Sequence, residues 1–251
     1  MDIIKRNFLL LIRNGAFGEE GAPEPMSRYK WSIMHSIADV HGVHAVINKA
    51  TGEPYAQQLL QLPDAGLSHL SNHWLNRRLK KIRTTEPTDP EASLETLNML
   101  DILVRTAEGM MTHGFSYADI VSVGIYMRKE GDKVDFVKLD IWLKRLCIAR
   151  MAQLIGSILI EALGFEKDEV PFVSDIEVKA MPMAIQALEN PTHIKTEDLE
   201  FHQGNNIFVT GNSKAMMQTV RNSMRFFFFA PLEAASCLMH SFLNGLANIE
   251  E

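Results

Sequence analysis

The sequence predicts an all-α fold, an irregular multi-helix bundle with at most one short pair of strands. Apolar residues recur at helical spacing through much of the 251-residue chain. Several of these runs begin after a Ser or Asp that suits a helix N-cap and end at a glycine. The apolar content of 46% excludes a disordered chain, because it provides enough side chains for a buried core.

The clearest pattern lies in residues 113–165, where three consecutive helices are expected. The first follows an N-cap at Ser116 and ends at Gly131, which can adopt the left-handed conformation of a helix stop. The second is capped by Asp135, and the third stops at Gly164. Their expected buried stripes are Leu139, Trp142, Leu143 and Leu146, followed by Met151, Leu154, Ile155, Ile158, Leu159 and Ala162.

Five helices are expected before this region, the last of them over Leu94–Met111. Ile3–Ile12 is apolar at helical spacing, Ser27 caps a second helix, and His44–Ala50 forms a short third one. The fourth is expected over Leu67–Ile82. Its predicted inward residues are Leu70, Trp74, Leu75 and Leu79.

After residue 165 the pattern is helical on either side of an irregular region, Asn190–Gly211. A helix kinked at Pro182 is expected over Ser174–Leu188. Asn206–Thr210 is the one strand candidate. The last two helices are expected over Lys214–Phe229 and Pro231–Leu246.

Arg83–Ser93 is the predicted linker, because its two prolines and polar residues do not continue a helix. It divides the chain into an N-terminal helical region, residues 1–82, and a C-terminal helical domain, residues 94–251. The alternative is that both parts form one continuous globule.

Charge and composition narrow the functional classes. A net charge of −6 argues against a general nucleic-acid binder. No apolar run approaches the ~20 residues of a membrane span, and Arg13 interrupts the first apolar run too early for a secretory signal. Cys147 and Cys237 lie in apolar helical patterns, typical of free thiols in a reducing compartment. We therefore expect a cytoplasmic protein that binds neither nucleic acid nor membrane.

Three stretches carry a resemblance to a known family. They are LLLIRNGAFGEE with YKWSIMHSIADVHGVHAVI, then HGF with VDFVKLDIWLKRL and ALGF, and finally HQGNN with RFFFFAPLEA. Together they resemble the uncharacterised nucleotidyltransferase family of Bacteroidetes and other bacteria. The resemblance implies an Asp-x-Asp pair on a strand, where both carboxylates point the same way and hold the metal ions. This sequence contains no Asp-x-Asp, so the resemblance implies the family's flanking helices without its catalytic core.

Two groups of residues are the nearest substitutes for that missing core. Asp175 and Glu177 are two residues apart, although Ser174 with Glu177 also forms a capping box. The Gly211–Lys214 turn precedes a predicted helix whose start suits a phosphate, although Ser213 also suits a simple N-cap. A reduced nucleotidyltransferase or nucleotide binder would use Asp175, Glu177, Gly211, Ser213 and Lys214.

Other clusters have a structural interpretation beside a functional one. His69 and His73 are four residues apart and could share a metal on one helix, but ordinary hydrogen-bonded histidines are favoured. Phe226–Phe229 suits either burial or a partner's groove. A basic patch for phosphate or an acidic partner competes with simple compensation of a helix dipole. Its residues are Arg77, Arg78, Lys80, Lys81 and Arg83.

The favoured hypothesis is a non-catalytic helical protein without metal or cofactor, which binds a protein partner or a second copy of itself. The helical stripes and fourteen methionines support it, because methionine suits adaptable packing surfaces. The alternative is the reduced nucleotidyltransferase or nucleotide binder.

Overall fold

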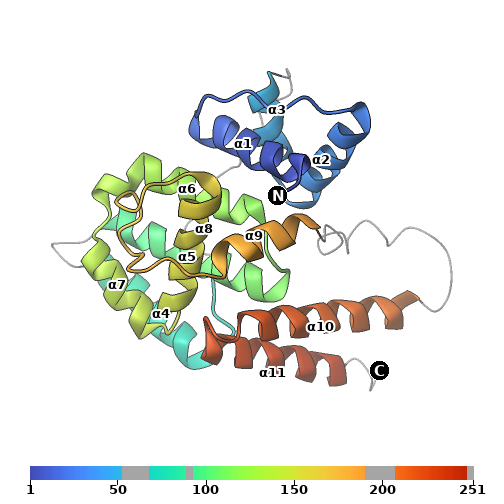
Figure 1. The fold of residues 1–251 in the computed structure, drawn as a ribbon. Helices are drawn as coiled ribbons and strands as arrows, with labels where there is room; N and C mark the ends of the chain where they lie inside the picture. The colour runs from blue at the N-terminus through green and yellow to red at the C-terminus, as the bar shows by residue number, and fades with distance from the viewer. Residues whose placement is uncertain (53–67, 89–92, 190–206, 248–251) are drawn as a thin grey trace. The chain divides into compact units, whose positions relative to one another are not determined.

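The computed structural model describes residues 1–52, 68–88, 93–189 and 207–247, with side chains of the last range described only from Met217 to Ser241. These residues form eleven α-helices and two short 3₁₀ helices, with no strand among them, which confirms the all-α prediction (Figure 1). The chain forms two compact units. Unit 1 is drawn from residues 1–64, 116–133 and 153–192, and unit 2 from residues 65–115, 134–152 and 193–251.

Unit 1 is built around the first three helices of the chain. Its helices are α1 (Ile3–Phe17), α2 (Arg28–Val40), α3 (His44–Thr51), α6 (Tyr117–Glu130), most of α8 (Ala149–Leu163) and α9 (Ala180–Glu189). α1 packs against α2, α3 and α6. α1 and α3 approach closely because Gly15 has no side chain, and a Cβ there would clash with the Val46 carbonyl.

An aromatic group fills the centre of unit 1. Phe8 is fully buried, and its ring lies 5.2 Å from that of Tyr117 and 6.3 Å from that of His41. The Tyr117 hydroxyl donates to the Ala184 carbonyl at 2.9 Å, and His41 Nε2 lies 3.2 Å from the Ala187 carbonyl oxygen. These bonds attach α9 to the core, because a buried polar tip needs a partner.

Unit 2 is organised around a long central helix. Its elements are α4 (His73–Thr85), η1 (Glu86–Thr88), α5 (Leu94–Thr112), α7 (Phe136–Arg145), the start of α8, α10 (Ile207–Phe226) and α11 (Pro231–Ala247). α5 packs against α7, α10 and α11, and α10 lies beside α11 as an antiparallel pair (Figure 1). Ser223 and Asn222 of α10 donate to the carbonyls of Met111 and Thr112 at the end of α5, both at 3.3 Å.

Much of the predicted local structure is confirmed. Asp135 caps α7 by accepting from the Lys138 N–H at 2.9 Å, and Ser27 caps α2. Gly164 has φ 77° and ends α8 in the left-handed conformation. The predicted inward stripes of α7 and α8 are all buried, with exposed fractions of 7% or less.

Three local predictions are wrong. Residues 207–210 of the predicted strand form the first turn of α10, so their β-branched side chains do not decide the outcome, and Asn206 lies outside the described residues. α9 begins at Ala180, not at Ser174, so Pro182 falls in the first turn, where its missing N–H costs no hydrogen bond and produces no kink. Gly131 has φ −55° and leads into η2 (Gly131–Lys133).

The start of α4 also differs, and this difference changes the protein surface. Residues 68–72 are not helical, and α4 begins at His73 because Asn72 caps it. Asn72 Oδ1 accepts from the N–H groups of Trp74 and Leu75 at 3.0 and 3.1 Å. From this start, Trp74 is 78% exposed, so its predicted inward position is wrong.

Candidate functional site

Large exposed apolar side chains are unevenly distributed between the two units. Among the described residues of unit 1 they are Met1, Tyr29, Ile176 and Val178. Those of unit 2 are Trp74, Leu94, Val137, Ile141, Met217, Met224, Phe227, Phe228, Leu232 and Met239. Exposed apolar side chains in such number are typical of a region that binds another molecule, which makes unit 2 the candidate for a binding site.

α4 has one apolar side and one basic side. Leu75, Leu79 and Ile82 point into unit 2 and are at most 5% exposed. Trp74, Arg78 and Lys81 follow at i, i+4 and i+7, so they form a second side, with Arg77 beside them, about 100° around the helix from the apolar side. Arg77, Arg78 and Lys81 are exposed, and no ion pair joins them to a carboxylate within the described residues. Their charges therefore face solvent beside an exposed indole.

Hydrogen bonds join α4 and its cap to α7 and α11, and a third bond joins α8 to the turn after α10. Arg78 Nη1 donates to the Arg145 carbonyl at the end of α7 at 3.0 Å. Asn72 Nδ2 donates to Ser236 Oγ of α11 at 2.8 Å. At the turn between α10 and α11, the Phe228 carbonyl accepts from Arg150 Nη1 of α8 at 3.3 Å. The segments that carry the exposed basic and aromatic side chains are therefore fixed relative to one another.

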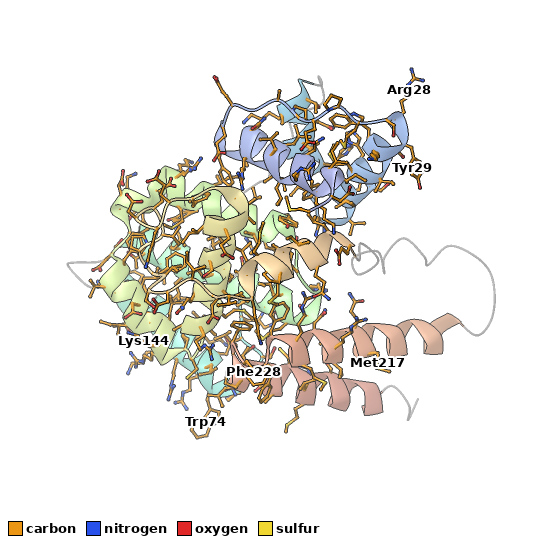
Figure 2. All side chains as sticks on the ribbon, viewed as in Figure 1. Arg28, Tyr29, Trp74, Lys144, Met217 and Phe228 are labelled. Carbon is orange, nitrogen blue, oxygen red and sulfur yellow. The ribbon has the colours of Figure 1, made fainter. Side chains whose placement is uncertain are left out.

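We name this surface the basic–aromatic face. Its residues are Trp74, Arg77, Arg78 and Lys81 of α4, Lys144 and Arg145 of α7, Arg150 of α8, and Phe228 after α10. In Figure 2, Trp74 extends away from the ribbon, and several side chains between Trp74 and Lys144 end in nitrogen. Lys144 also pairs with Asp140 at 2.6 Å, so part of its charge is compensated.

The structure separates Arg83 from the predicted basic patch. Its guanidinium turns toward α5, where Nε lies 2.9 Å from Asp101 Oδ1, and Ser68 Oγ lies 3.1 Å from the same oxygen. The Asp101 side chain is 6% exposed and that of Arg83 is 18% exposed. Arg83 therefore stabilises the packing of α4 on α5. Lys80 remains exposed on α4, but 3.6 residues per turn place it about 100° around the helix from Lys81.

The four consecutive phenylalanines divide into two pairs. Phe226 and Phe229 are buried, at 0% and 3% exposure, whereas Phe227 and Phe228 are 41% and 69% exposed. The guanidinium of Arg150 lies 5.7 Å from the centre of the Phe229 ring. The run thus anchors the turn between α10 and α11 with two rings and presents the other two to solvent.

A buried carboxylate holds the start of α4 against α11. Glu233 is 1% exposed and accepts from the N–H groups of Ser71 and Asn72, the latter at 3.1 Å. Burial raises the pKa of Glu233, while the hydrogen bonds from Asn72 and Ser71 act in the opposite direction. Ser71 Oγ lies 3.1 Å from Cys237 Sγ, and burial raises the pKa of that thiol to about 11, which makes it a poor nucleophile. This cluster positions Trp74.

The predicted histidine pair is not formed. His69 precedes α4 and lies 3.1 Å from Glu108 of α5, so the assignment of His69 and His73 to one helix is wrong. Burial raises the pKa of the Glu108 carboxyl, and His69 partly offsets this effect. Over the described ranges, no group of three or more His, Cys, Asp or Glu side chains has an arrangement that could hold a metal ion.

The residues predicted for nucleotide binding lie in different units. Asp175 and Glu177 belong to a non-helical segment of unit 1, so the predicted capping box at Ser174 is wrong. Gly211, Ser213 and Lys214 belong to unit 2 and lie inside α10, so the turn predicted before a helix is also wrong there. Inside a helix, backbone N–H groups bond to carbonyls of the preceding turn and not to a phosphate.

Comparisons of this chain with protein-family models, with curated proteins and with solved structures return no match. Among the helices of the described ranges, none combines the length and the apolar content that crossing a membrane requires.

Sequence reasoning found the basic residues of α4 but missed the rest of the face. Nothing in the sequence links Lys144 and Arg145 of α7 to α4, and the run of four phenylalanines does not distinguish Phe228 from its neighbours. One available signal was the polar spacing of Arg77, Arg78 and Lys81, which places Trp74 on the same side of the helix.

Proposed function

We propose that this chain is a non-catalytic binding module and that the basic–aromatic face of unit 2 binds its protein partner. One observation carries the proposal: Trp74 is 78% exposed beside basic side chains, on a helix that hydrogen bonds of Arg78 and Asn72 join to α7 and α11. Exposing an indole has no benefit for folding, whereas Trp and Arg dominate the binding energy of many interfaces.

The surroundings of Trp74 support a binding role over an accidental exposure. Asn72 and the buried Glu233 fix the start of α4, so the indole projects from a fixed backbone. A fixed backbone loses little conformational entropy when a partner binds. The surrounding positive charges would steer an acidic partner toward the face and fix its orientation.

Site-specific photo-cross-linking tests this proposal in the cells that produce the protein naturally. A photoreactive phenylalanine analogue replaces Trp74 in one variant and Tyr29, which is 75% exposed in unit 1, in the matched control. We expect protein cross-links from position 74, few from position 29, and their loss when Arg77→Glu and Lys81→Glu are added. Equal cross-linking from both positions, or none from position 74, would contradict the proposal.

The non-catalytic part of the proposal has its own test. Thermal melting with ATP, CTP, GTP or UTP plus magnesium is expected to leave the melting temperature unchanged. A stabilisation that disappears in Asp175→Ala would instead favour the reduced nucleotidyltransferase.

We propose that the protein is cytoplasmic, because the free thiols of Cys147 and Cys237 are typical of a reducing compartment.

A further inference from the structure

We infer that the partner of the basic–aromatic face is a second copy of this chain, which binds through an acidic segment of unit 1. The inference rests on the proposed function, because it names the occupant of the same face. It comes from two complementary surfaces, one in each unit, that every copy of the chain carries.

The two units differ in charge. The residues of unit 1 comprise 11 Lys or Arg and 17 Asp or Glu, whereas those of unit 2 comprise 14 of each kind. The entire net charge of −6 therefore resides in unit 1. Unit 2 is neutral overall and has a local basic face, whereas unit 1 has an excess of acidic residues. Each copy of the chain therefore has one surface of each sign.

The segment between α8 and α9 concentrates the acidic residues of unit 1. Glu166, Asp168 and Asp175 are exposed, and Lys167 between the first two is the one exposed cation of residues 166–178. Two exposed apolar residues lie in the same segment, Ile176 at 41% and Val178 at 86%. We name residues 166–178 the acidic segment. It combines negative charge with apolar side chains, as the basic–aromatic face combines positive charge with aromatic ones.

The acidic segment is held in place although it is not helical near Asp175. Gln153 Nε2 of α8 donates to the Asp175 carbonyl at 2.7 Å, and the Glu177 N–H donates to Ser157 Oγ at 3.0 Å. Val170 and Val173 are buried, and Gly156 of α8 allows this close approach because a Cβ there would clash with Val173. The exposed side chains therefore project from a fixed backbone, which is the condition for specific docking.

The expected contact pairs Ile176 and Val178 of one copy with Trp74 and Phe228 of another. The carboxylates of the acidic segment would then face Arg77 and Lys81. Ion pairs at such a rim set orientation and association rate, while the apolar contact slows dissociation. Association should therefore weaken as salt rises, because the Debye length falls from about 10 Å at 0.1 M to about 3 Å at 1 M.

A charge-swap experiment with the full chain tests this inference. The first variant, R77E with K81E, reverses the two charges that the acidic segment is expected to face, and the second, D168K with D175K, reverses two carboxylates of that segment. Multi-angle light scattering and sedimentation should show wild-type masses above the 28.3 kDa of one chain, increasing with concentration. Each variant alone should dissociate at least about tenfold more readily, because the reversed residues then face charges of their own sign.

An equimolar mixture of the two variants should associate again. The reversed residues of one variant then face the reversed residues of the other, so opposite charges meet again. K80E is the matched control, because Lys80 is exposed on α4 but lies off the stripe of Trp74, Arg78 and Lys81. It should associate as the wild type does. Circular dichroism should show unchanged helix content in all variants, since every altered side chain is exposed.

Several results would overturn the inference. A wild-type chain that remains monomeric at all concentrations and salt levels would overturn it. Association that the charge reversals leave unchanged would also overturn it. A third contrary result is binding of the face to single-stranded nucleic acid or to anionic vesicles in place of a second copy. Cross-links from position 74 to a different protein, with a monomeric purified chain, would refute the second copy but leave the proposed function standing. Cross-links to residues 166–178 between isotopically distinct copies would support both.

Discussion

The buried titratable groups of the two units differ in kind. In unit 1 the imidazole of His41 is 3% exposed and lies against the rings of Phe8 and Tyr117. In unit 2 the corresponding groups are carboxylates, with Glu233 at 1% and Asp101 at 5% exposure. A neutral ring needs little from its surroundings, whereas a buried carboxylate requires donors or a cation. The titratable imidazole of unit 1 is therefore buried as a neutral ring among aromatic ones, whereas the buried carboxylates of unit 2 depend on specific polar partners.

The units differ in their exposed surfaces as well as in their buried titratable groups. The polar partners of unit 2 join segments far apart in sequence, such as Asn72 with Glu233, and these same segments carry exposed basic and aromatic side chains. Unit 2 thus uses buried polar contacts to hold a surface that an apolar core alone would not specify. The following experiments address the two units separately.

Arg83→Ala should have the largest effect and should destabilise unit 2. It leaves the Asp101 carboxylate buried without its cation, which costs about 3–5 kcal/mol for a buried ion pair. Urea unfolding followed by the fluorescence of Trp142, with Trp31 and Trp74 replaced by Phe, measures this cost in unit 2. Arg77→Ala on the exposed side of α4 is the control and should stay within about 0.5 kcal/mol. Similar losses from both substitutions would show that Arg83 has no structural role.

Acidification should destabilise unit 1 through His41. Burial lowers the pKa of His41 from 6.5 to about 4, so the unfolded chain binds a proton between these values and the folded unit does not. The contribution of His41 to the free energy of unfolding is fully present above pH 6.5. It decreases by about 3 kcal/mol as the pH falls toward 4. Urea unfolding between pH 7 and 4, followed by Trp31 as the single tryptophan, measures the loss.

The control for this experiment is His41→Gln, which removes the titrating group. It should flatten the dependence on pH between 6.5 and 4 although it destabilises the unit at neutral pH. If the Trp31 signal shows the same pH dependence with and without His41, the buried imidazole is not the cause.

The same acidification should act on Glu233 of unit 2 in the opposite direction and by a smaller amount. Burial raises the pKa of Glu233 above 4.5, so the folded unit holds this proton more tightly than the unfolded chain does. Stability from this group is therefore complete below the unfolded pKa and is lost as pH rises through the folded pKa. Glu233→Gln should remove this dependence from the Trp142 unfolding curves. An unchanged curve would mean that Glu233 has the same pKa in both states.

Cys147→Gly should give the smallest effect, a stabilisation of unit 2 by about 1 kcal/mol. Cys147 has φ 56°, and its N–H and that of Ile148 donate to the Lys144 and Leu143 carbonyls at 3.1 Å. This is a Schellman helix end, where glycine adopts the left-handed conformation without strain. The urea midpoint of the glycine variant should rise, whereas Cys147→Ala should leave it nearly unchanged. Equal midpoints for both variants would exclude backbone strain at this position.

The elements that the sequence predicts well are those decided within one helix. The buried stripe from Leu139 to Leu146 follows from its spacing, and the Asp135 cap lies three residues from the N–H that it binds. The exposure of Trp74 depends on where α4 begins, and Glu233, far away in sequence, holds that start. The inward turn of Arg83 depends in the same way on Asp101. Periodicity does not contain such long-range pairings, so it predicts the helices but not the surface that they form.

The division of each unit into three separated stretches has a consequence for synthesis on the ribosome. Phe8 and His41 leave the ribosome early, yet Tyr117 and the Ala184 and Ala187 carbonyls that complete their surroundings follow much later. Until residue 189 has emerged, the nascent chain carries an unfinished aromatic core. Chaperone occupancy during translation should therefore persist through α9.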